Sequence, residues 1–479
     1  MKKTLILVTS IVFFIELLDT TILYACAIPI THDFKIGAAK ISLPIISYLM
    51  GTYILIPLSA WLSHRYNRIK IIISLLAAFS LFSIFCGLSS ELYIFSACRF
   101  LQGITISLCS TIALITLLSV CTQKEMVPLM GSINILALFG TAIGPFLGAF
   151  FSYYMSWRIA FMINFPICFL MVISLMSLKS LSFQPSAYQA KLDWLGLSLI
   201  SLSLVIMSIG LQQLNTTVTL SCLLILSGVT LSTAYLLIWQ TRQKKGIPHK
   251  KESILELHVF KNPDFLFGIL INIIARSAMC GLPILINILL QKLYHFSVIK
   301  AGGYLAVIAS AAITAKLASS FINQWSVHKS IIFFTGFAAL SIAALSPLEW
   351  LVRTGFLWTA CFLFGLTTSL VYTVMNAALY ITLPRTEIAN ASNIGTIIQQ
   401  FSIGLGIAIA VGGLALFQSS HGITGTEEYQ KTILIFYHRI CDFLAFLMLL
   451  NTIISIYFNI YRKNNFLSKE RCLIIQPNL

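Results

Sequence analysis

The chain has 479 residues, of which 58% are hydrophobic and 10% are charged, and its mean hydropathy is +0.92. A soluble protein carries about 25% charged residues, so this composition excludes an ordinary water-soluble globular protein. The net charge of +16 would suit a nucleic-acid partner. We expect no nucleic acid, because Lys and Arg also gather in the cytoplasmic loops of membrane proteins.

Apolar runs long enough to cross a bilayer as helices recur along the whole chain. We expect fourteen spans, at residues 4–29, 41–63, 69–90, 92–120, 127–151, 158–180, 194–214, 217–240, 265–290, 301–326, 330–348, 355–383, 391–418 and 433–461. An even number of spans places both termini on one side of the membrane, and most of the 31 Lys and Arg residues then fall in loops on that side. The positive-inside rule therefore predicts a multi-pass protein with both termini in the cytoplasm.

Two carboxylates, Glu16 and Asp19, lie inside the first apolar run. An acid at that depth costs roughly 2.5–3.5 kcal/mol on insertion scales, which favours a functional role. The same carboxylates argue against a cleaved signal peptide, so we expect an uncleaved first span. Residues three apart share one helix face, and repulsion between two acids in a low dielectric favours protonation of at least one of them. The pair predicts a site that can carry protons across a membrane.

Arg99 lies inside the fourth span, and we expect it to meet Asp19. At a rise of 1.5 Å per residue, Asp19 lies roughly 13 Å, and Arg99 roughly 11 Å, below the outer end of its helix. Protonation of Asp19 would then release Arg99, although a permanent structural ion pair is an alternative. Three roles stay open for Glu16: a second proton site, a cation-binding group, or a silent protonated residue.

Two further motifs join or fill the early spans. The turn between the second and third spans is basic and contains His64, Arg65, Arg68 and Lys70. In the fifth span the motif residues are Gly140, Gly144, Pro145 and Gly148. Glycines spaced by four clear one helix face for another backbone, and a proline within a helix bends it.

In this order and spacing, the motifs resemble the major facilitator superfamily, and within it the fourteen-helix drug:proton antiporter branch (EmrB/QacA type). The matching segments are Leu18–Thr21 through Pro29, residues 60–70, Arg99 with Gln102 and Gly103, Gly140–Ala149, Trp157–Arg158, Phe161–Pro166, Asp193–Gly196 and Asn393–Gly406. The resemblance implies an all-α polytopic membrane fold with two six-helix halves, 1–182 and 264–479, separated by linkers and two inserted helices in 183–263.

The resemblance also implies roles for single residues. The motif that contains Arg99, Gln102 and Gly103 is linked in the family to proton transfer, and the Gly140–Ala149 segment matches the antiporter motif. Residues 60–70 match the gating loop, but His64 replaces an aspartate there, so we expect the gating bond either to differ or to depend on protonation of His64. An arginine usual in the branch near Gln399 is also missing.

The most direct functional prediction is proton-driven efflux of small amphipathic compounds or drugs by alternating access in the bacterial inner membrane. The partners would be the substrate, protons and the lipid bilayer; a periplasmic adaptor is left open. We expect no cofactor besides the transmembrane proton gradient, and no metal. Alternatives are a proton-coupled importer or exporter of a specific metabolite and a non-transporting membrane sensor. An enzyme is not expected, because no metal cluster, Ser/His arrangement or phosphate-binding glycine loop is present.

The ionisable residues of the later spans bear on the substrate. Arg276, Lys316 and Gln102 are predicted to line the substrate cavity. Three cations against two acids favour anionic or zwitterionic amphipathic substrates over lipophilic cations. Hydrogen bonds to carbonyl groups of neighbouring helices are the alternative for Arg276 and Lys316. Arg439 and Asp442, three apart near the end of the last span, are expected to neutralise each other.

Overall fold

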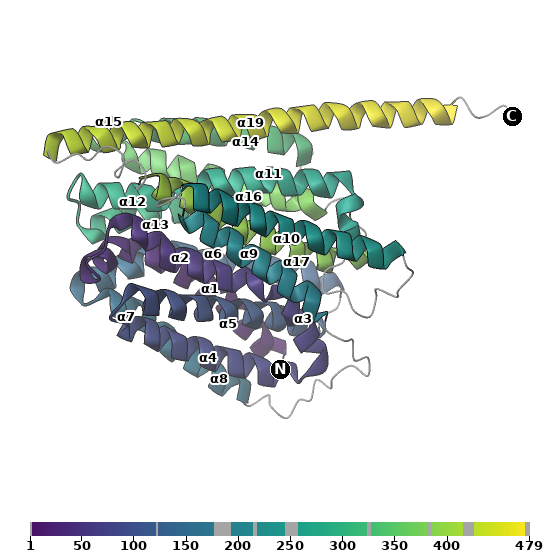
Figure 1. Ribbon diagram of the computed structural model, residues 1–479, viewed down its shortest axis with the longest axis horizontal. Coiled ribbons are helices and arrows are strands. Elements are labelled where there is room, and N and C mark those ends of the chain that lie inside the picture. Colours follow the sequence, from purple (N-terminus) through teal and green to yellow (C-terminus); the bar gives the residue numbers. More distant parts are fainter. Residues whose placement is uncertain are drawn as a thin grey trace.

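The computed structural model describes residues 2–120, 123–176, 193–213, 218–244, 257–322, 327–380, 383, 385–414 and 426–474. Every regular element in these ranges is a helix (Figure 1). The first group comprises α1 (Lys2–Asp33), η1 (Ala38–Ile41), α2 (Ser42–Ile54), α3 (Ile56–Arg65), α4 (Arg68–Leu88), α5 (Leu92–Leu118), α6 (Gln123–Tyr154), α7 (Trp157–Met162) and α8 (Asn164–Met176). Two further helices follow, α9 (Trp194–Gln213) and α10 (Val218–Lys244). The last group comprises η3 (Leu257–Lys261), α11 (Pro263–Met279), α12 (Leu282–Lys292), α13 (Val298–Ile322), α14 (Val327–Leu345), α15 (Leu348–Thr354), α16 (Leu357–Tyr380), α17 (Arg385–Ile407), η4 (Ala408–Gly412) and α19 (Thr426–Ile474).

Twelve segments in the described ranges are long and apolar enough to cross a membrane. Each coincides with one of the fourteen predicted spans. The other two predictions, 127–151 and 194–214, correspond to α6 and to α9, where a shorter apolar stretch covers Trp194–Gly210. The all-helical, membrane-spanning fold is therefore confirmed, while the count of fourteen spans stays a prediction.

The helices form two packed groups. Within the first group, α1 packs on α5 and α6, α2 packs on α5, and α4 packs on α5, α7 and α8. Within the last, α11 packs on α16, α17 and α19, and α13 and α14 both pack on α16. This arrangement agrees with two helical halves, but residues 177–192 and 245–256 lie outside the described ranges, so the predicted domain boundaries stay predictions.

The two groups touch near the end of the bundle that carries Asp33, which we call the Asp33 end. A Cβ on Gly302 of α13 would lie 2.5 Å from the Ala149 Cβ and 3.2 Å from the main-chain oxygen of Pro145, both on α6. On the adjoining helices, Asn287 Nδ2 of α12 donates to the main-chain oxygen of Tyr24 in α1 at 2.6 Å. Small residues and one buried amide therefore hold the halves together there.

Helices α9 and α10 differ from a simple lipid-facing insert. The Ser201 hydroxyl of α9 donates to the main-chain oxygen of Ile54 at 3.0 Å, and Ser208 shares a short hydrogen bond with Tyr53 of α2. Since α9 also packs on α17, it contacts both halves. Both helices also expose large apolar side chains, such as Leu202 on α9 and Leu223 on α10.

The last helix, α19, crosses the whole bundle along one edge and extends beyond it (Figure 1). Arg439 and Asp442 are both exposed on it. The ion pairs of the described residues do not include these two side chains. The expectation that they neutralise each other was therefore wrong, because a spacing of three residues allows contact but does not impose it at an exposed position.

Candidate functional site

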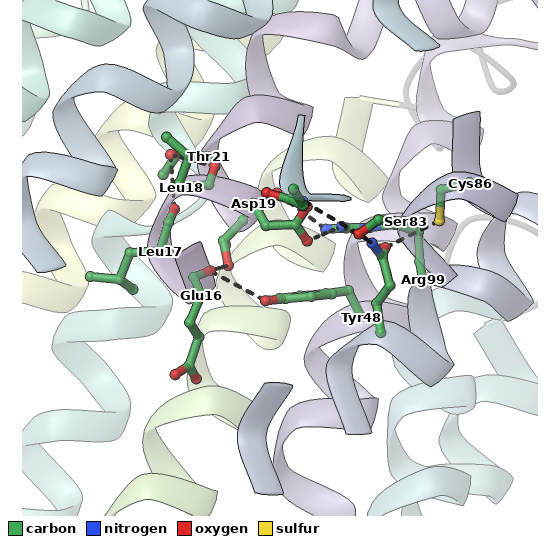
Figure 2. Close-up of polar contacts among 12 residues, drawn as sticks. Glu16, Leu17, Leu18, Asp19, Thr21, Tyr48, Ser83, Cys86 and Arg99 are labelled. Atoms are coloured by element: carbon green, nitrogen blue, oxygen red, sulfur yellow. Dashed lines mark hydrogen bonds and ion pairs between the residues drawn. The ribbon is translucent and has the colours of Figure 1, made fainter. Parts of the chain in front are cut away.

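Asp19 and Arg99 form a buried ion pair between α1 and α5 (Figure 2). Arg99 Nη1 donates to Asp19 Oδ2, and Nη2 lies 3.4 Å from the Asp19 main-chain oxygen. The two side chains are 1% and 0% exposed. The structure thus brings together the two charges that the sequence placed at similar depth; their part in proton coupling stays a prediction.

Neutral polar side chains surround this pair. Asn164 Nδ2 of α8 donates to Asp19 Oδ1 at 2.7 Å. Gln102 Oε1 accepts from Arg99 Nη1 at 3.2 Å, and Gln102 Nε2 donates to the Ser83 hydroxyl at 2.6 Å. Gln102, predicted to line the substrate cavity, is therefore part of the Asp19–Arg99 network. Each oxygen of the carboxylate therefore accepts a hydrogen bond from a side chain of another helix.

An aromatic wall holds the guanidinium in place. The Arg99 guanidinium carbon lies 4.1 Å from the centre of the Tyr48 ring and 5.4 Å from that of Phe161, which are cation–π distances. Two glycines allow this contact: a Cβ on Gly103 would lie 2.2 Å from the Tyr48 main-chain oxygen, and one on Gly51 would also strike α5. The close approach of α2 and α5 therefore sets the ring against Arg99.

Glu16 lies on α1 one turn before Asp19, but its carboxyl points away from the ion pair (Figure 2). Its side chain is half-buried and interacts with the Ser110 hydroxyl of α5. Its main-chain oxygen accepts a hydrogen bond from the Tyr48 hydroxyl at 3.2 Å. The two acids therefore occupy different surroundings. Among the hydrogen bonds of the described residues, Tyr48 is the one that connects Glu16 to the region of the ion pair.

A second buried arginine, Arg276 of α11, is 8% exposed and is held by neutral groups. Its Nη2 donates to Gln399 Oε1 at 2.8 Å and to Asn376 Oδ1 at 3.4 Å, and its Nε donates to Asn272 Oδ1 at 3.3 Å. The Tyr372 ring lies against it, with 4.4 Å between the guanidinium carbon and the ring centre. In the described part of the chain, Arg276 has no acidic partner.

Two predicted site residues cannot be placed in this way. Lys316 lies on α13 and His64 lies on α3, but the side chains of both are outside the described residues. Their predicted roles in the substrate cavity and the gating loop stay predictions.

The rest of the gating loop forms a tight connection between α3 and α4. Asn67 caps α4, and its side-chain oxygen accepts hydrogen bonds from the main-chain nitrogens of Ile69 at 3.0 Å and Lys70 at 3.3 Å. Such a cap satisfies amide groups that a helix start leaves without partners. Arg68 Nε donates to a main-chain carbonyl of α3 at 2.9 Å, while Arg65 and Lys70 are exposed.

The predicted glycine face of α6 packs directly on α1. A Cβ would lie 2.3 Å from the main-chain oxygen of Phe14 at Gly140, 2.1 Å from the Thr21 hydroxyl at Gly144, and 2.7 Å from a main-chain oxygen of α1 at Gly148. Real Cβ atoms do not approach so closely, so these positions require glycine. They bring α6 against the helix that carries the carboxylates. No group of three His, Cys, Asp or Glu side chains suited to a metal lies among the described residues.

This arrangement can switch its charge. With Asp19 ionised, the pair with Arg99 is neutral, whereas protonation leaves a buried guanidinium without its counter-ion. Buried ionisable side chains inside two touching helical bundles are typical of membrane transport proteins. The fold and the site together define a polytopic membrane transporter.

The chain belongs to the Major Facilitator Superfamily, whose sequence profile matches residues 9–407. It is 28% identical over 413 residues to "Probable transport protein HsrA" of Haemophilus influenzae, covering 84% of this chain and 86% of that protein. It is 23% identical to "Putative multidrug resistance protein MdtD" of Escherichia coli, covering 85% of both chains. The family consists of transporters and not of enzymes, so the protein is a multi-pass membrane protein that takes a small-molecule substrate.

Solved structures share the fold. The D-xylose-proton symporter superposes with a TM-score of 0.64 at 13% identity, over 93% of this chain and 96% of that one. A bacterial homologue of the human lysosomal transporter Spinster, in an inward-facing and unoccupied conformation, superposes with a TM-score of 0.64 at 14% identity, over 95% and 96%. At these identities the likeness shows the fold alone.

Sequence reasoning missed several residues of the site. Tyr48 and Ser83 carried no signal, because aromatic and hydroxyl side chains are common in apolar helices. Asn164 was predicted only as part of the segment Phe161–Pro166, and Asn376 was not predicted. A polar residue deep in an apolar run was the available signal for both asparagines.

Proposed function

We propose that this protein is a proton-driven exporter of small amphipathic compounds, an antiporter of the drug:proton type, and that Asp19 is its proton-accepting group. The observation that carries the proposal is the ion pair between Asp19 and Arg99. It lies within apolar helices, is closed to solvent, and has a neutral donor on its second carboxylate oxygen.

The physics of the pair supports coupling between protonation and conformation. Breaking a buried ion pair by neutralising one partner is unfavourable by about 3–5 kcal/mol, because the other charge stays buried. Once Asp19 carries a proton, Arg99 must find another partner or move. Arg99 Nε already lacks a partner within the described residues, so the guanidinium is not fully satisfied even in the paired state.

Asn164 can serve both protonation states. Its Nδ2 donates to the ionised Asp19, while its own Oδ1 is buried and has no hydrogen-bond partner in the described part of the chain. When Asp19 gains a proton, the new O–H can donate to that oxygen after a rotation of the amide. The same residue thus stabilises the carboxylate as a donor and the carboxylic acid as an acceptor.

In this mechanism the two halves rock around the central site. Asp19 takes a proton from the outer side, loses its hold on Arg99, and the protein turns inward, where proton release accompanies substrate binding. By the positive-inside rule, both termini would lie in the cytoplasm, and the membrane of this proposal is the bacterial inner membrane. The Asp33 end would then be the outer end, so the contact of Gly302 with α6 would close the outer side. The proton gradient supplies the energy, with no resident cofactor.

Inside-out membrane vesicles test the proposal. A preformed proton gradient, read by a pH-sensitive dye, is challenged with a panel of amphipathic drugs and metabolites. An antiporter's substrate collapses the gradient in vesicles with the wild-type protein and leaves it intact in vesicles with Asp19→Asn. The matched control is Asp33→Asn, which changes an acid of the same helix that is 41% exposed.

Two outcomes would contradict the proposal. Proton-coupled transport that persists in Asp19→Asn would remove Asp19 as the proton site. A substrate that collapses the gradient only when it is loaded inside the vesicles, and so leaves together with protons, would indicate a symporter. A symporter is the alternative that shares this fold.

A further inference from the structure

Arg276 carries a charge that the described part of the protein does not neutralise. Its three hydrogen-bond acceptors are the neutral amide oxygens of Asn272, Asn376 and Gln399. Amide dipoles satisfy donors but leave the net charge at +1. Buried charges are normally paired with an opposite charge, as Arg99 is, so the lone guanidinium needs an explanation.

The amides around Arg276 are fixed in orientation by one another. Gln399 Nε2 donates to Asn376 Oδ1 at 3.2 Å, and the same oxygen accepts from Arg276 Nη2. Turning the Asn376 amide over would set its NH2 group against two donors. This closed triangle links α11, α16 and α17, and it directs the Asn376 nitrogen away from Arg276 Nη2.

Two nitrogens of this cluster have unused donor hydrogens. Arg276 Nη1 and Asn376 Nδ2 make no hydrogen bond among the described residues. Some side-chain atoms without a partner are fully buried, but these two nitrogens are not among them. Both therefore lie on an accessible part of the cluster. A guanidinium N–H and an amide N–H in one place are donors that suit the two oxygens of a carboxylate.

The cluster also lies near the other half of the protein. Tyr24 of α1 is a neighbour of two residues of the cluster. These are Tyr372, whose ring lies against Arg276, and Cys280, which is 2.9 Å from the Tyr372 hydroxyl. Substrate sites of transporters built from two halves lie at such an interface. The aromatic rings of Tyr24 and Tyr372 offer apolar surface beside the charge.

From these observations we infer that Arg276, with Asn376, is the binding site for the carboxylate group of an amphipathic organic anion, whose apolar part lies against Tyr372 and Tyr24. The inference rests on the proposed transport function, since it names the substrate class of that transporter. The bound carboxylate supplies the negative charge that the cluster lacks. A lipophilic cation would meet the same unneutralised charge and be repelled.

Equilibrium binding to the purified full-length protein tests the inference. The probes are 1-naphthylacetate and octanoate, each compared by calorimetry with its neutral amide and with the amine of matching size. The wild-type protein should bind each carboxylate at least about tenfold more tightly than its amide, the effect of one charge-assisted hydrogen bond. It should not bind the amines.

Four variants complete the test. Arg276→Gln should abolish the preference for the carboxylate, and Arg276→Lys should keep part of it. Asn376→Asp sets an internal carboxylate beside Arg276, so it should raise the thermal stability of the protein and exclude the carboxylate probes. Arg439→Gln changes an exposed arginine of α19 and should leave the preference intact.

Equal binding of acid and amide, binding of neither carboxylate, or a preference that survives in Asn376→Asp would each overturn the inference. These measurements need no proton gradient, so they are independent of Asp19. Failure of the carboxylate test with intact proton-coupled transport would remove only the substrate class. Failure of the vesicle test on Asp19→Asn, with the carboxylate preference intact, would remove only the proton mechanism.

Discussion

Neutralising one member of the Asp19–Arg99 pair should damage the protein more than neutralising both. Asp19→Asn keeps the shape of the side chain and its contact with Asn164, but it leaves the Arg99 guanidinium buried without a counter-ion. Arg99→Gln leaves the carboxylate in the same position. The double variant replaces two charges with two amides that can still hydrogen-bond each other.

The magnitude follows from the burial of the pair. Side chains that are 0% and 1% exposed are screened little by solvent. Two unit charges about 4 Å apart attract by about 4 kcal/mol at an effective dielectric constant of about 20. Each single variant should lose about 3–5 kcal/mol. The double variant should lose less than either single variant, because it buries no unpaired charge. The interaction energy between the two changes is then larger than the loss in a single variant.

Thermal unfolding in detergent, followed by tryptophan fluorescence at one fixed scan rate, measures the order of the variants. Fixing the rate matters, because large membrane proteins unfold irreversibly. The double variant should melt above both single variants. The control changes are Asp33→Asn and Arg158→Gln, at side chains that are 41% and 32% exposed. The stability of these variants should lie within about 1 kcal/mol of the wild type. A double variant that melts below both singles would refute the reasoning.

Three further outcomes are expected. Gly140→Ala should separate α6 from α1 and lower both the melting temperature and transport, whereas Gly336→Ala, whose Cβ would lie 3.9 Å from its nearest neighbour, should do neither. Tyr48→Leu should lose about 0.5–2 kcal/mol of cation–π attraction, and Tyr48→Phe should retain most of it; melting curves of the two compared with the wild type decide. Asn164→Leu should slow proton-coupled transport, because it removes the charge-assisted hydrogen bond that Asn164 donates to the ionised Asp19; a transport rate equal to that of the wild type in the vesicle assay would contradict this.

The sequence by itself determined the class of the fold and the charges within it. Apolar runs of bilayer length can only be helices, because lipid offers no partner for free backbone groups. A charged residue inside such a run stands out for the same reason. The sequence therefore indicated three charged residues that are unfavourable in apolar segments, namely Asp19, Arg99 and Arg276. The helical rise per residue placed Asp19 and Arg99 at a similar depth.

Only the tertiary structure decided which groups surround those charges. Which neighbour an aromatic or amide side chain contacts depends on how each helix is rotated about its axis. Apolar periodicity does not determine that rotation, because the lipid-facing and the buried faces of a helix are both apolar. Tyr48 meets Arg99 because glycines let α2 and α5 approach closely. The Glu16 carboxyl likewise points away from Asp19 (Figure 2), although the spacing of the two residues placed both on one helix face.

The same limit separates the two arginines. From the sequence, Arg99 had an expected partner in Asp19, whereas Arg276 was left between a place in the substrate cavity and hydrogen bonds to carbonyl groups of neighbouring helices. In the structure, Arg99 has a carboxylate, while Arg276 has one amide oxygen from its own helix, two from other helices, and accessible donors left over. The sequence determined where charge enters the membrane. The packing of distant helices decided whether that charge is neutralised within the protein or left for a ligand, because a counter-ion must come from a segment whose position only the folded chain fixes.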